Sequence, residues 1–260
     1  MKQFEAEIIS NRSVAPGWKE LVLSWEPGAG RPEPGQFLSL RVSPRSDPLL
    51  RRPFAFSDLS EDGSRASAIY QVRGPATSIL AELAPGSAID AIGPLGRGFP
   101  RPMPGELPIL AAGGIGLGPV LFLARSLAAP TLVLGFRDAS ALPDLELPEG
   151  RVTCTDDGSA GFHGNPAEWI ARNVSADLVR LYGCGPAPML AALAGLAAER
   201  SWATSLSAEQ WMACGVGACM GCALRRSDGK GYLRACSDGP VFSARSGEAS
   251  PVDWNPRRPA

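Results

Sequence analysis

The chain has 260 residues, a length that fits one to two domains or three small ones. Lys and Arg number 25 and Asp and Glu 26, so the net charge is −1. Such a balance gives no electrostatic reason to expect nucleic acid or an anionic membrane as a partner. The sequence contains no apolar run of about 18 residues and no secretory signal, so we expect a cytoplasmic protein that does not cross a membrane.

Residues 1–102 are expected to form an antiparallel β-barrel. Short segments of alternating polarity are separated by Gly/Pro turns, which is typical of such barrels. We expect a short helix from Thr77, as its N-cap, to Leu83, and a glycine-rich turn over 92–99. The expected strands are 4–10, 19–25, 37–42 and 66–72.

Residues 103–206 change character. Short apolar runs alternate with helical stretches, a pattern that predicts a Rossmann-like α/β domain with a parallel sheet and helices on both faces. The expected strands are 107–114, 131–136, 151–155 and 177–183. The expected helices are 119–127, 166–172 and 188–199.

Two glycine-rich segments in this second block each follow an expected strand and open a helix. Such turns let a phosphate approach the backbone and the helix N-terminus, although a glycine-rich turn often serves packing alone. The carboxyl ends of parallel strands share one edge of the sheet, so we expect both segments to face one nucleotide. They contain Gly113, Gly114, Gly116 and Gly118, and Gly183, Cys184, Gly185 and Pro186.

The last block, residues 207–260, contains four clustered cysteines with the spacing C-x4-C-x2-C-x13-C. This spacing matches ferredoxin-type 2Fe-2S clusters, because a zinc ribbon usually shows two C-x2-C pairs. A structural zinc knuckle is the alternative. The predicted metal ligands are Cys214, Cys219, Cys222 and Cys236.

Three glycines within the cysteine loop are expected to allow tight wrapping, positive φ angles and backbone N–H groups aimed at the sulfurs. They are Gly215, Gly217 and Gly221. The two remaining cysteines, Cys154 and Cys184, are expected to be small buried side chains.

The segment RRPFAFS in the first block combines arginine with aromatic rings. Arg52 is suited to a pyrophosphate and Phe54 to a flat ring system, but the segment taken alone favours an ordinary strand with a solvated arginine. Gly74 lies in a turn before an expected helix N-terminus, which is a second candidate anion site.

The order of these motifs along the chain resembles the ferredoxin-NADP reductase superfamily. Within it, the stretches MACGVGACMGCAL and CSDGPVF resemble the electron-transfer subunits of B-type, NAD-dependent dihydroorotate dehydrogenases. The resemblance covers nearly the whole chain. It implies an FAD-binding barrel, an NAD-binding α/β domain and a small C-terminal 2Fe-2S domain.

The resemblance also implies roles for particular residues, and none of them is catalytic. The residues implied to hold FAD are Arg52, Pro53, Phe54, Ala55, Gly74 and Thr77. Both glycine-rich segments are implied to hold the nicotinamide nucleotide, and the four clustered cysteines the 2Fe-2S cluster. Two positions depart from the family pattern: Ala55 stands where many relatives have Ser, and Ala76 where Gly is common.

The implied function is electron transfer in pyrimidine biosynthesis. A cluster passes single electrons and NAD+ accepts a hydride, so a flavin must join the two. Electrons are expected to pass from the FMN of a separate catalytic dihydroorotate dehydrogenase subunit through 2Fe-2S and FAD to NAD+. The implied assembly is a heterotetramer of two plus two subunits, with the cysteine loop facing the catalytic subunit.

Two other functions stay open at the level of sequence. A related iron–sulfur flavoprotein could serve a hydrogenase, a sulfite reductase or a ferredoxin-linked complex. A non-enzymatic zinc adaptor on a degenerate reductase scaffold would account for Ala55 and Ala76. The choice between NADH and NADPH is also open, because Arg137 suits a 2′-phosphate and Asp138 a free ribose. His163, the single histidine, is expected in a loop without a role in hydride transfer.

Overall fold

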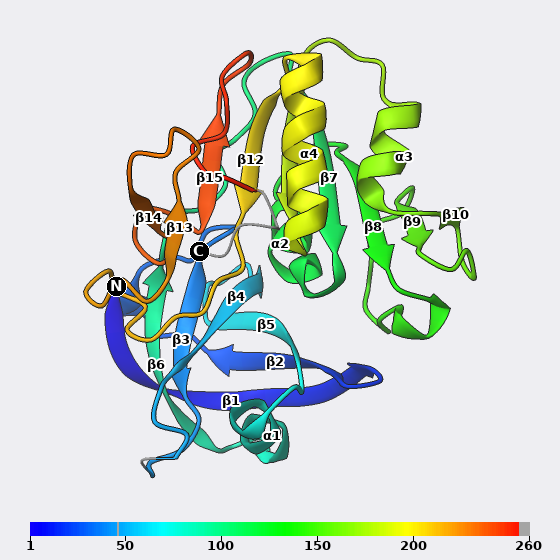
Figure 1. Cartoon of the computed structure of the whole chain (residues 1–260). Helices are drawn as coiled ribbons and strands as arrows, with labels where there is room; N and C mark the ends of the chain where they lie inside the picture. Colours follow the sequence, from blue (N-terminus) through cyan, green and yellow to red (C-terminus); the bar gives the residue numbers. More distant parts are fainter. Residues whose placement is uncertain (46, 255–260) are drawn as a thin grey trace.

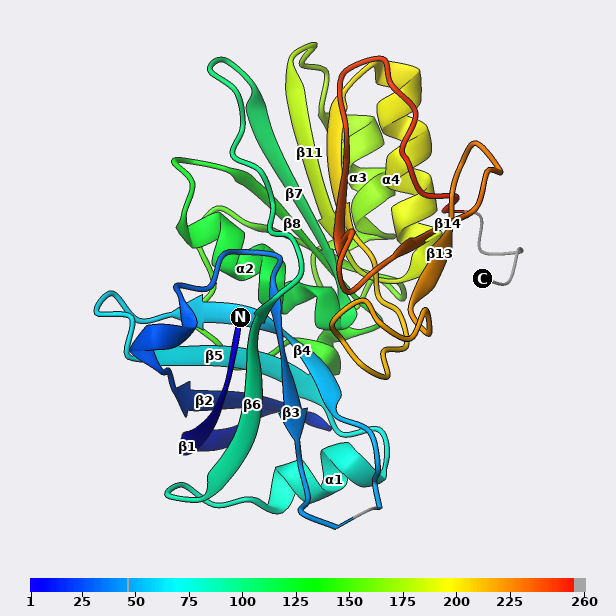
Figure 2. The same ribbon diagram turned by 90° about the vertical axis from the view of Figure 1, so that its left-hand side faces the viewer.

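The computed structural model describes residues 1–45 and 47–254. A closed barrel and a seven-stranded sheet with helices lie one above the other, and a cysteine-rich segment lies beside both (Figures 1 and 2). This arrangement confirms the predicted fold class.

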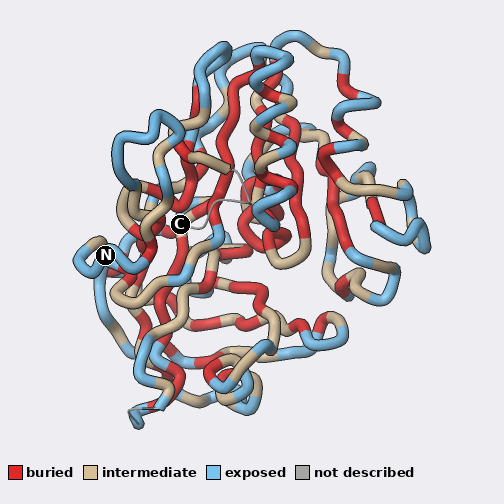
Figure 3. The backbone as a smooth tube through the Cα atoms, viewed as in Figure 1, coloured by how far each residue is buried: buried red, intermediate tan, exposed pale blue. Residues whose placement is uncertain are grey.

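The barrel forms because strands with alternating burial close around one apolar core (Figure 3). Leu21, Leu40 and Phe56 lie at its centre and are fully buried. Antiparallel pairing joins the strands in the order β1-β2-β5-β4-β3-β6. Their bounds are β1 Lys2–Ala15, β2 Trp18–Ser24, β3 Phe37–Arg41, β4 Arg52–Leu59, β5 Arg65–Gln71 and β6 Ala88–Leu95.

Two local predictions in the barrel are wrong. The expected turn over 92–99 is strand up to Leu95, because these residues pair with β1 and β3. Gly93 fits under the Trp25 ring, where a Cβ would come within 2.9 Å. The helix α1, Pro75–Glu82, begins two residues before Thr77. Proline has no N–H to satisfy and a fixed φ that suits the first position of a helix, so Pro75 starts α1.

The sheet has the order β10-β9-β8-β7-β11-β12-β15. All its neighbours are parallel except β15, which pairs antiparallel with β12. The last cysteine-containing block therefore supplies the edge strand of the same sheet. The bounds are β7 Leu107–Gly113, β8 Thr131–Phe136, β9 Val152–Thr155, β10 Phe162–His163, β11 Val179–Cys184, β12 Ala203–Ser207 and β15 Val241–Ala244.

Helices cover both faces of the sheet, as predicted (Figures 1 and 2). Alternation along β7 shows why: Leu110 and Ala112 pack on the face that α2 covers, and Ile109 and Ala111 on the face of α3 and α4. The helices are α2 Leu117–Arg125, α3 Pro166–Asn173 and α4 Ala187–Arg200. Short 3-10 helices are η1 Pro27–Ala29, η2 Gly114–Gly116 and η3 Ala139–Ala141.

Helix α2 also joins the sheet to the barrel. Its Gly118 faces Ser57 of β4 so closely that a Cβ would lie 3.4 Å from the Ser57 side chain. Arg125, at the end of the helix, pairs with Asp58 at 3.1 Å and donates to the Ser57 carbonyl. These contacts fix how the barrel lies against the sheet.

The segment between β12 and β15 contains the clustered cysteines and a small hairpin, β13 Ala223–Arg225 and β14 Tyr232–Arg234. It packs against the barrel rather than forming a large core of its own. Phe37 and Leu95 of the barrel share one buried cluster with Cys222, Ala235 and Cys236. The thiols are thereby held against strands β3 and β6.

Candidate functional site

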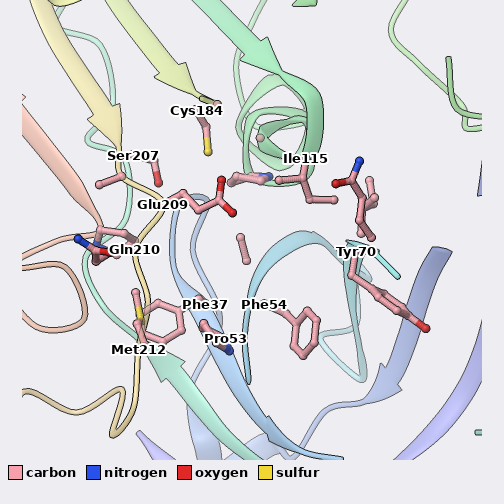
Figure 4. Close-up of a pocket in the computed structure, with 18 of the residues that line it drawn as sticks. Phe37, Pro53, Phe54, Tyr70, Ile115, Cys184, Ser207, Glu209, Gln210 and Met212 are labelled. Carbon is pink, nitrogen blue, oxygen red and sulfur yellow. The ribbon is translucent and has the colours of Figure 1, made fainter. Parts of the chain in front are cut away.

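A cavity of about 270 Å³ lies where the barrel, the carboxyl edge of the sheet and the cysteine segment meet (Figure 4). Carboxyl edges of parallel sheets are the usual place for ligands in such folds. The lining residues are Phe37, Pro53, Phe54, Ala55, Ile69, Tyr70, Gln71, Arg73, Thr77, Ile115, Gly116, Pro119, Cys184, Gly185, Ser207, Ala208, Glu209, Gln210, Met212 and Pro240.

The part of the barrel wall formed by β4 and Tyr70 is largely apolar. Pro53, Phe54 and Ala55 reach it from β4, as the sequence predicts for a ring-binding strand. Phe54 meets Tyr70 edge to face, with ring centroids 5.7 Å apart. The Tyr70 hydroxyl donates to Asn11 Oδ1 at 2.9 Å, and burial raises the pKa of Tyr70 to about 12. Such a wall is suited to a flat aromatic ligand.

Two residues predicted to bind a diphosphate differ in position. Thr77 lines the cavity, whereas Arg52 does not and donates to the Leu50 carbonyl at 2.6 Å. The prediction that Thr77 is an N-cap is wrong: it occupies the third helical position of α1. Its hydroxyl accepts from the N–H groups of Arg73 at 2.9 Å and Gly74 at 3.1 Å. Thr77 thus ties the turn to the helix it precedes.

The sheet wall contains three of the predicted nucleotide-binding residues: Gly116, Cys184 and Gly185. The end of β11 lies so close to η2 that a Cβ on Gly116 would come within 2.1 Å of the Cys184 carbonyl oxygen. Only glycine fits there. The two glycine-rich segments are therefore brought together, as predicted from their positions after parallel strands.

The remaining predicted residues of these segments surround the wall without lining it. Gly113 packs against Pro186 and Met189, and Gly183 packs against Leu193 and Leu206. Gly118 supports the contact between α2 and the barrel. Gly114 is left-handed, with φ 52°, at the start of η2. Their glycine character serves close packing and the tight turn.

Cys184 is half-buried at the end of β11, and burial raises the pKa of its thiol to about 12. A hydrogen bond with the Ser207 side chain lowers this pKa in part. A thiol with so high a pKa is not a nucleophile at neutral pH. Cys154 is fully buried, and its pKa is raised to about 11 by burial. This environment agrees with the packing role expected for Cys154.

Several lining residues were not identified from the sequence. Gln71 Oε1 is buried and has no hydrogen-bond partner among residues 1–45 and 47–254, so it is a free acceptor beside the cavity. Ser207 ends β12 and Glu209 follows it, and the sequence did not predict this strand. Phe37 and Met212 come from segments 175 residues apart, and only the fold brings them together.

The four predicted ligand thiols lie as two neighbouring pairs. The sulfur atoms of Cys222 and Cys236 are 3.2 Å apart. The Cys214 thiol is hydrogen-bonded to the Cys219 thiol. No three metal-ligating side chains gather around one point among the described residues. Two pairs of thiols fit a binuclear cluster, which takes four cysteines, two on each iron.

Backbone N–H groups point at these sulfurs, as expected. Gly217 N–H donates to Cys236 at 3.1 Å and Gly221 N–H to Cys219 at 3.4 Å. Gly217 is in the left-handed region at φ 87°, as is Gly215 at 70°. Gly221 is not, and Met220, at φ 60°, takes that conformation instead. The expectation of positive φ is thus confirmed for two of the three glycines.

Backbone N–H groups of the cysteine loop also lower the pKa of one of the four thiols. Burial alone would raise the pKa of the Cys214 thiol, but N–H groups of Val216, Ala218 and Cys219 and the Cys219 thiol lower it to about 6. The Cys236 thiol lies deeper, and burial and the Cys222 thiol raise its pKa to about 12. Directed N–H groups favour the thiolate, which is the form that binds metal.

The cavity and the thiols share a wall. Phe37 and Met212 line the cavity, and both pack in the buried cluster that contains Cys222 and Cys236 (Figure 4). The cavity and the buried thiols of Cys222 and Cys236 therefore meet at Phe37 and Met212.

Comparisons with known proteins identify the family. Residues 209–246 match the iron-sulfur cluster binding domain of dihydroorotate dehydrogenase B. The electron transfer subunit of dihydroorotate dehydrogenase B (NAD(+)) from Desulforamulus reducens is 37% identical over 253 residues, which are 93% of this chain and 96% of that protein. The chain belongs to this family of electron transfer subunits. The Bacillus caldolyticus subunit is 39% identical over 91% of this chain and 95% of its own length.

Solved structures agree with the fold. The NADH-dependent reduced ferredoxin-NADP oxidoreductase, studied for flavin-based electron bifurcation, has a TM-score of 0.80 and 25% identity over 96% of this chain and 90% of its own. Phthalate dioxygenase reductase has a TM-score of 0.60 and 18% identity over 95% and 77%. Within the described residues, no helix is long and apolar enough to span a membrane.

Membership confirms the predicted function at the level of the subunit: this chain is the electron transfer subunit of an NAD-dependent dihydroorotate dehydrogenase, an oxidoreductase of pyrimidine biosynthesis. The structure places His163 in the exposed edge strand β10, away from the cavity lining. No role follows for it.

Proposed function

We propose that the cavity holds the FAD ring and that the two thiol pairs hold a 2Fe-2S cluster. The single observation that carries this proposal is the shared wall at Phe37 and Met212, which sets the cavity against the buried thiol pair of Cys222 and Cys236. Bound flavin would supply the exchange between one-electron and hydride chemistry. The chain itself holds the two groups next to each other.

The residues present fit a flavin. Pro53, Phe54 and Ala55 offer an apolar strand for a flat ring, and Gln71 Oε1 offers an acceptor to a ring N–H. Ala55 has no hydroxyl, so only its backbone is available to the ring at that position. The start of α1, with Gly74 before it, suits the diphosphate because its first N–H groups lack helical partners.

The nicotinamide nucleotide is proposed to lie at the sheet wall, over Gly116, Cys184 and Gly185. Gly113, Gly114, Gly118, Gly183 and Pro186 support that wall from behind. We propose NAD+ rather than NADP+, because Asp138 follows β8 at the same edge. Its carboxylate pKa is lowered to about 2 by Ser140 and Arg137, so it is ionised and would repel a 2′-phosphate.

The proposed partner is the FMN-bearing catalytic subunit of dihydroorotate dehydrogenase, in an assembly of two plus two subunits. Four large apolar side chains stand exposed on or near the cysteine loop, and such residues mark protein contact sites. They are Trp211 (88% exposed), Val216 (44%), Met220 (49%) and Tyr232 (55%). Electrons would enter there, pass the thiol site and leave at the sheet wall.

A reducing compartment such as the cytoplasm is proposed, because it keeps clustered thiols free for a metal. No described cysteine forms a disulfide. The four clustered thiols are therefore all available as ligands for the proposed cluster.

The test is cofactor analysis of the chain purified without air. We expect one FAD and one 2Fe-2S cluster per chain, with flavin bands over broad iron–sulfur absorption. A colourless protein with bound zinc would contradict the proposal. Flavin without iron, persisting after reconstitution with iron and sulfide, would contradict the assignment of the four cysteines.

A further inference from the structure

Glu209 is the one carboxylate among the described residues that line the cavity. Figure 4 shows its side chain turned into the cavity, between Cys184 and Phe37. It is exposed and forms no hydrogen bond or ion pair with another residue of 1–45 and 47–254. Its charge nevertheless acts on the Cys184 thiol. The fold therefore keeps an ionisable side chain at the cavity without a structural partner.

The backbone on each side of Glu209 is fixed by contacts that leave its side chain free. The Ala208 N–H donates to the Pro240 carbonyl at 2.9 Å. The Gln210 amide donates to the Ala223 carbonyl at 3.2 Å and accepts from the Trp211 N–H. The backbone at Glu209 is thus anchored at the cavity wall before any ligand arrives, and only the side chain remains to be ordered on binding.

The two charged residues described in the cavity lining, Arg73 and Glu209, come from different parts of the wall. Arg73 lies on the barrel side, before α1. Glu209 lies two residues after Ser207, the last residue of β12, and Ser207 pairs with Cys184 at the end of β11. A cation therefore lies toward the proposed diphosphate site, and an anion lies at the sheet edge proposed for the nicotinamide.

We propose that Glu209 selects the oxidised nicotinamide ring, binding NAD+ in preference to NADH. This inference rests on the proposed function of the sheet wall. The ring of NAD+ carries a positive charge and the ring of NADH does not, so a carboxylate in a partly enclosed cavity attracts only the oxidised form. The residue would strengthen binding of the hydride acceptor and ease release of the product.

The test compares binding of two unreactive ligands to the oxidised, FAD-loaded and cluster-loaded chain by calorimetry. NAD+ has the charged ring, and 1,4,5,6-tetrahydro-NAD has an uncharged ring that donates no hydride. The variants are Glu209→Gln, which removes the charge at constant size, and Glu209→Asp, which keeps it. Glu199→Gln is the matched control, because Glu199 is exposed on α4 and does not line the cavity.

For Glu209→Gln, we expect NAD+ affinity to fall about tenfold and affinity for the uncharged analogue to stay within about twofold. Glu209→Asp keeps most of the preference, and Glu199→Gln binds like the parent. Flavin absorbance and the melting temperature establish that each variant is folded and loaded.

Equal loss of both ligands, or no loss of NAD+ affinity, would overturn the inference while the proposed function stands. A loaded parent chain that fails to bind NAD+ would overturn the proposed nucleotide site and this inference together. A change in flavin reduction potential without a change in ligand preference would assign Glu209 to the flavin and also overturn it.

Discussion

The parallel sheet and the cysteine loop lie side by side, yet they are held together differently. Both faces of the sheet are packed with buried apolar side chains, so its shape is fixed by burial. The cysteine loop shares one small buried cluster with the barrel. Within the loop, N–H groups donate to sulfur, and Arg234 donates to the Gly217 carbonyl and pairs with Asp238. The sheet wall of the site is therefore held by its own core, and we expect the cysteine loop to depend more on what its thiols bind.

The largest effect is expected from replacing a thiol of the cysteine loop, which should loosen the loop and leave the sheet intact. Cys222→Ser removes one ligand from the buried pair, and we expect the chain to lose its iron while it retains FAD. Hydrogen exchange should then speed up in the cysteine loop and stay slow in β7 and β11.

Cys154→Ala is the matched control, because this thiol is buried in the sheet. It should keep its iron. Iron retention by Cys222→Ser would contradict the ligand assignment.

A core substitution in the sheet should lower the stability of the fold and leave the iron content unchanged. Leu134 of β8 is fully buried, and Leu134→Ala should lower the free energy of unfolding by about 2–5 kcal/mol. Iron content per folded chain should stay unchanged. Leu224→Ala, in the partly buried hairpin, should cost clearly less in thermal denaturation; an equal cost would show that the loop is held by packing after all.

Alkaline pH should test the barrel wall. Burial raises the pKa of Tyr70 from about 10 to about 12, so the folded state favours the neutral phenol. Stability from this group is complete below pH 10 and is lost as the pH rises toward 12.

Tyr70→Phe should remove this part of the pH dependence, roughly 1–3 kcal/mol between pH 10 and 12. Urea denaturation at several pH values measures it. An unchanged slope would contradict burial of the hydroxyl. Tyr182→Phe is the matched comparison in the sheet, where burial also raises the tyrosine pKa.

The smallest expected change in stability is at the shared wall. Phe37→Leu keeps an apolar side chain and should cost about 1 kcal/mol. It should nevertheless slow reduction of the thiol-bound centre by NADH more than reduction of the flavin, because Phe37 lines the cavity and packs with Cys222 and Cys236. Rapid-mixing absorbance at flavin and iron–sulfur wavelengths separates the two rates. Equal slowing of both would contradict a bridging position.

The sequence predicted those parts of the fold that depend on local pattern. Alternating strands indicated the barrel, strands alternating with helices indicated the sheet, and cysteine spacing identified the four clustered thiols, although their arrangement in two pairs is visible only in the structure. β12 was missed because its letters, ATSLS, are largely polar, although all five residues are buried between β11 and β15. Burial in a central strand is a tertiary property that composition does not show.

The cavity itself was only half predictable. The β4 residues and the glycine turns stand in motifs, so Pro53 and Gly116 were found. Phe37, Gln71 and Glu209 have no local signal and reach the cavity only through the packing of barrel on sheet. Thr77 was assigned as a cap because threonine is a common N-cap residue, but Pro75 starts the helix earlier.

The most direct measurement of the central claim is an anaerobic titration of the purified chain with NADH, followed by visible and electron paramagnetic resonance spectroscopy. If the cavity and the thiol pairs form one path through Phe37 and Met212, NADH bleaches the flavin and a paramagnetic signal of a reduced 2Fe-2S centre follows. A flavin that bleaches while the centre stays oxidised under excess NADH would contradict the account.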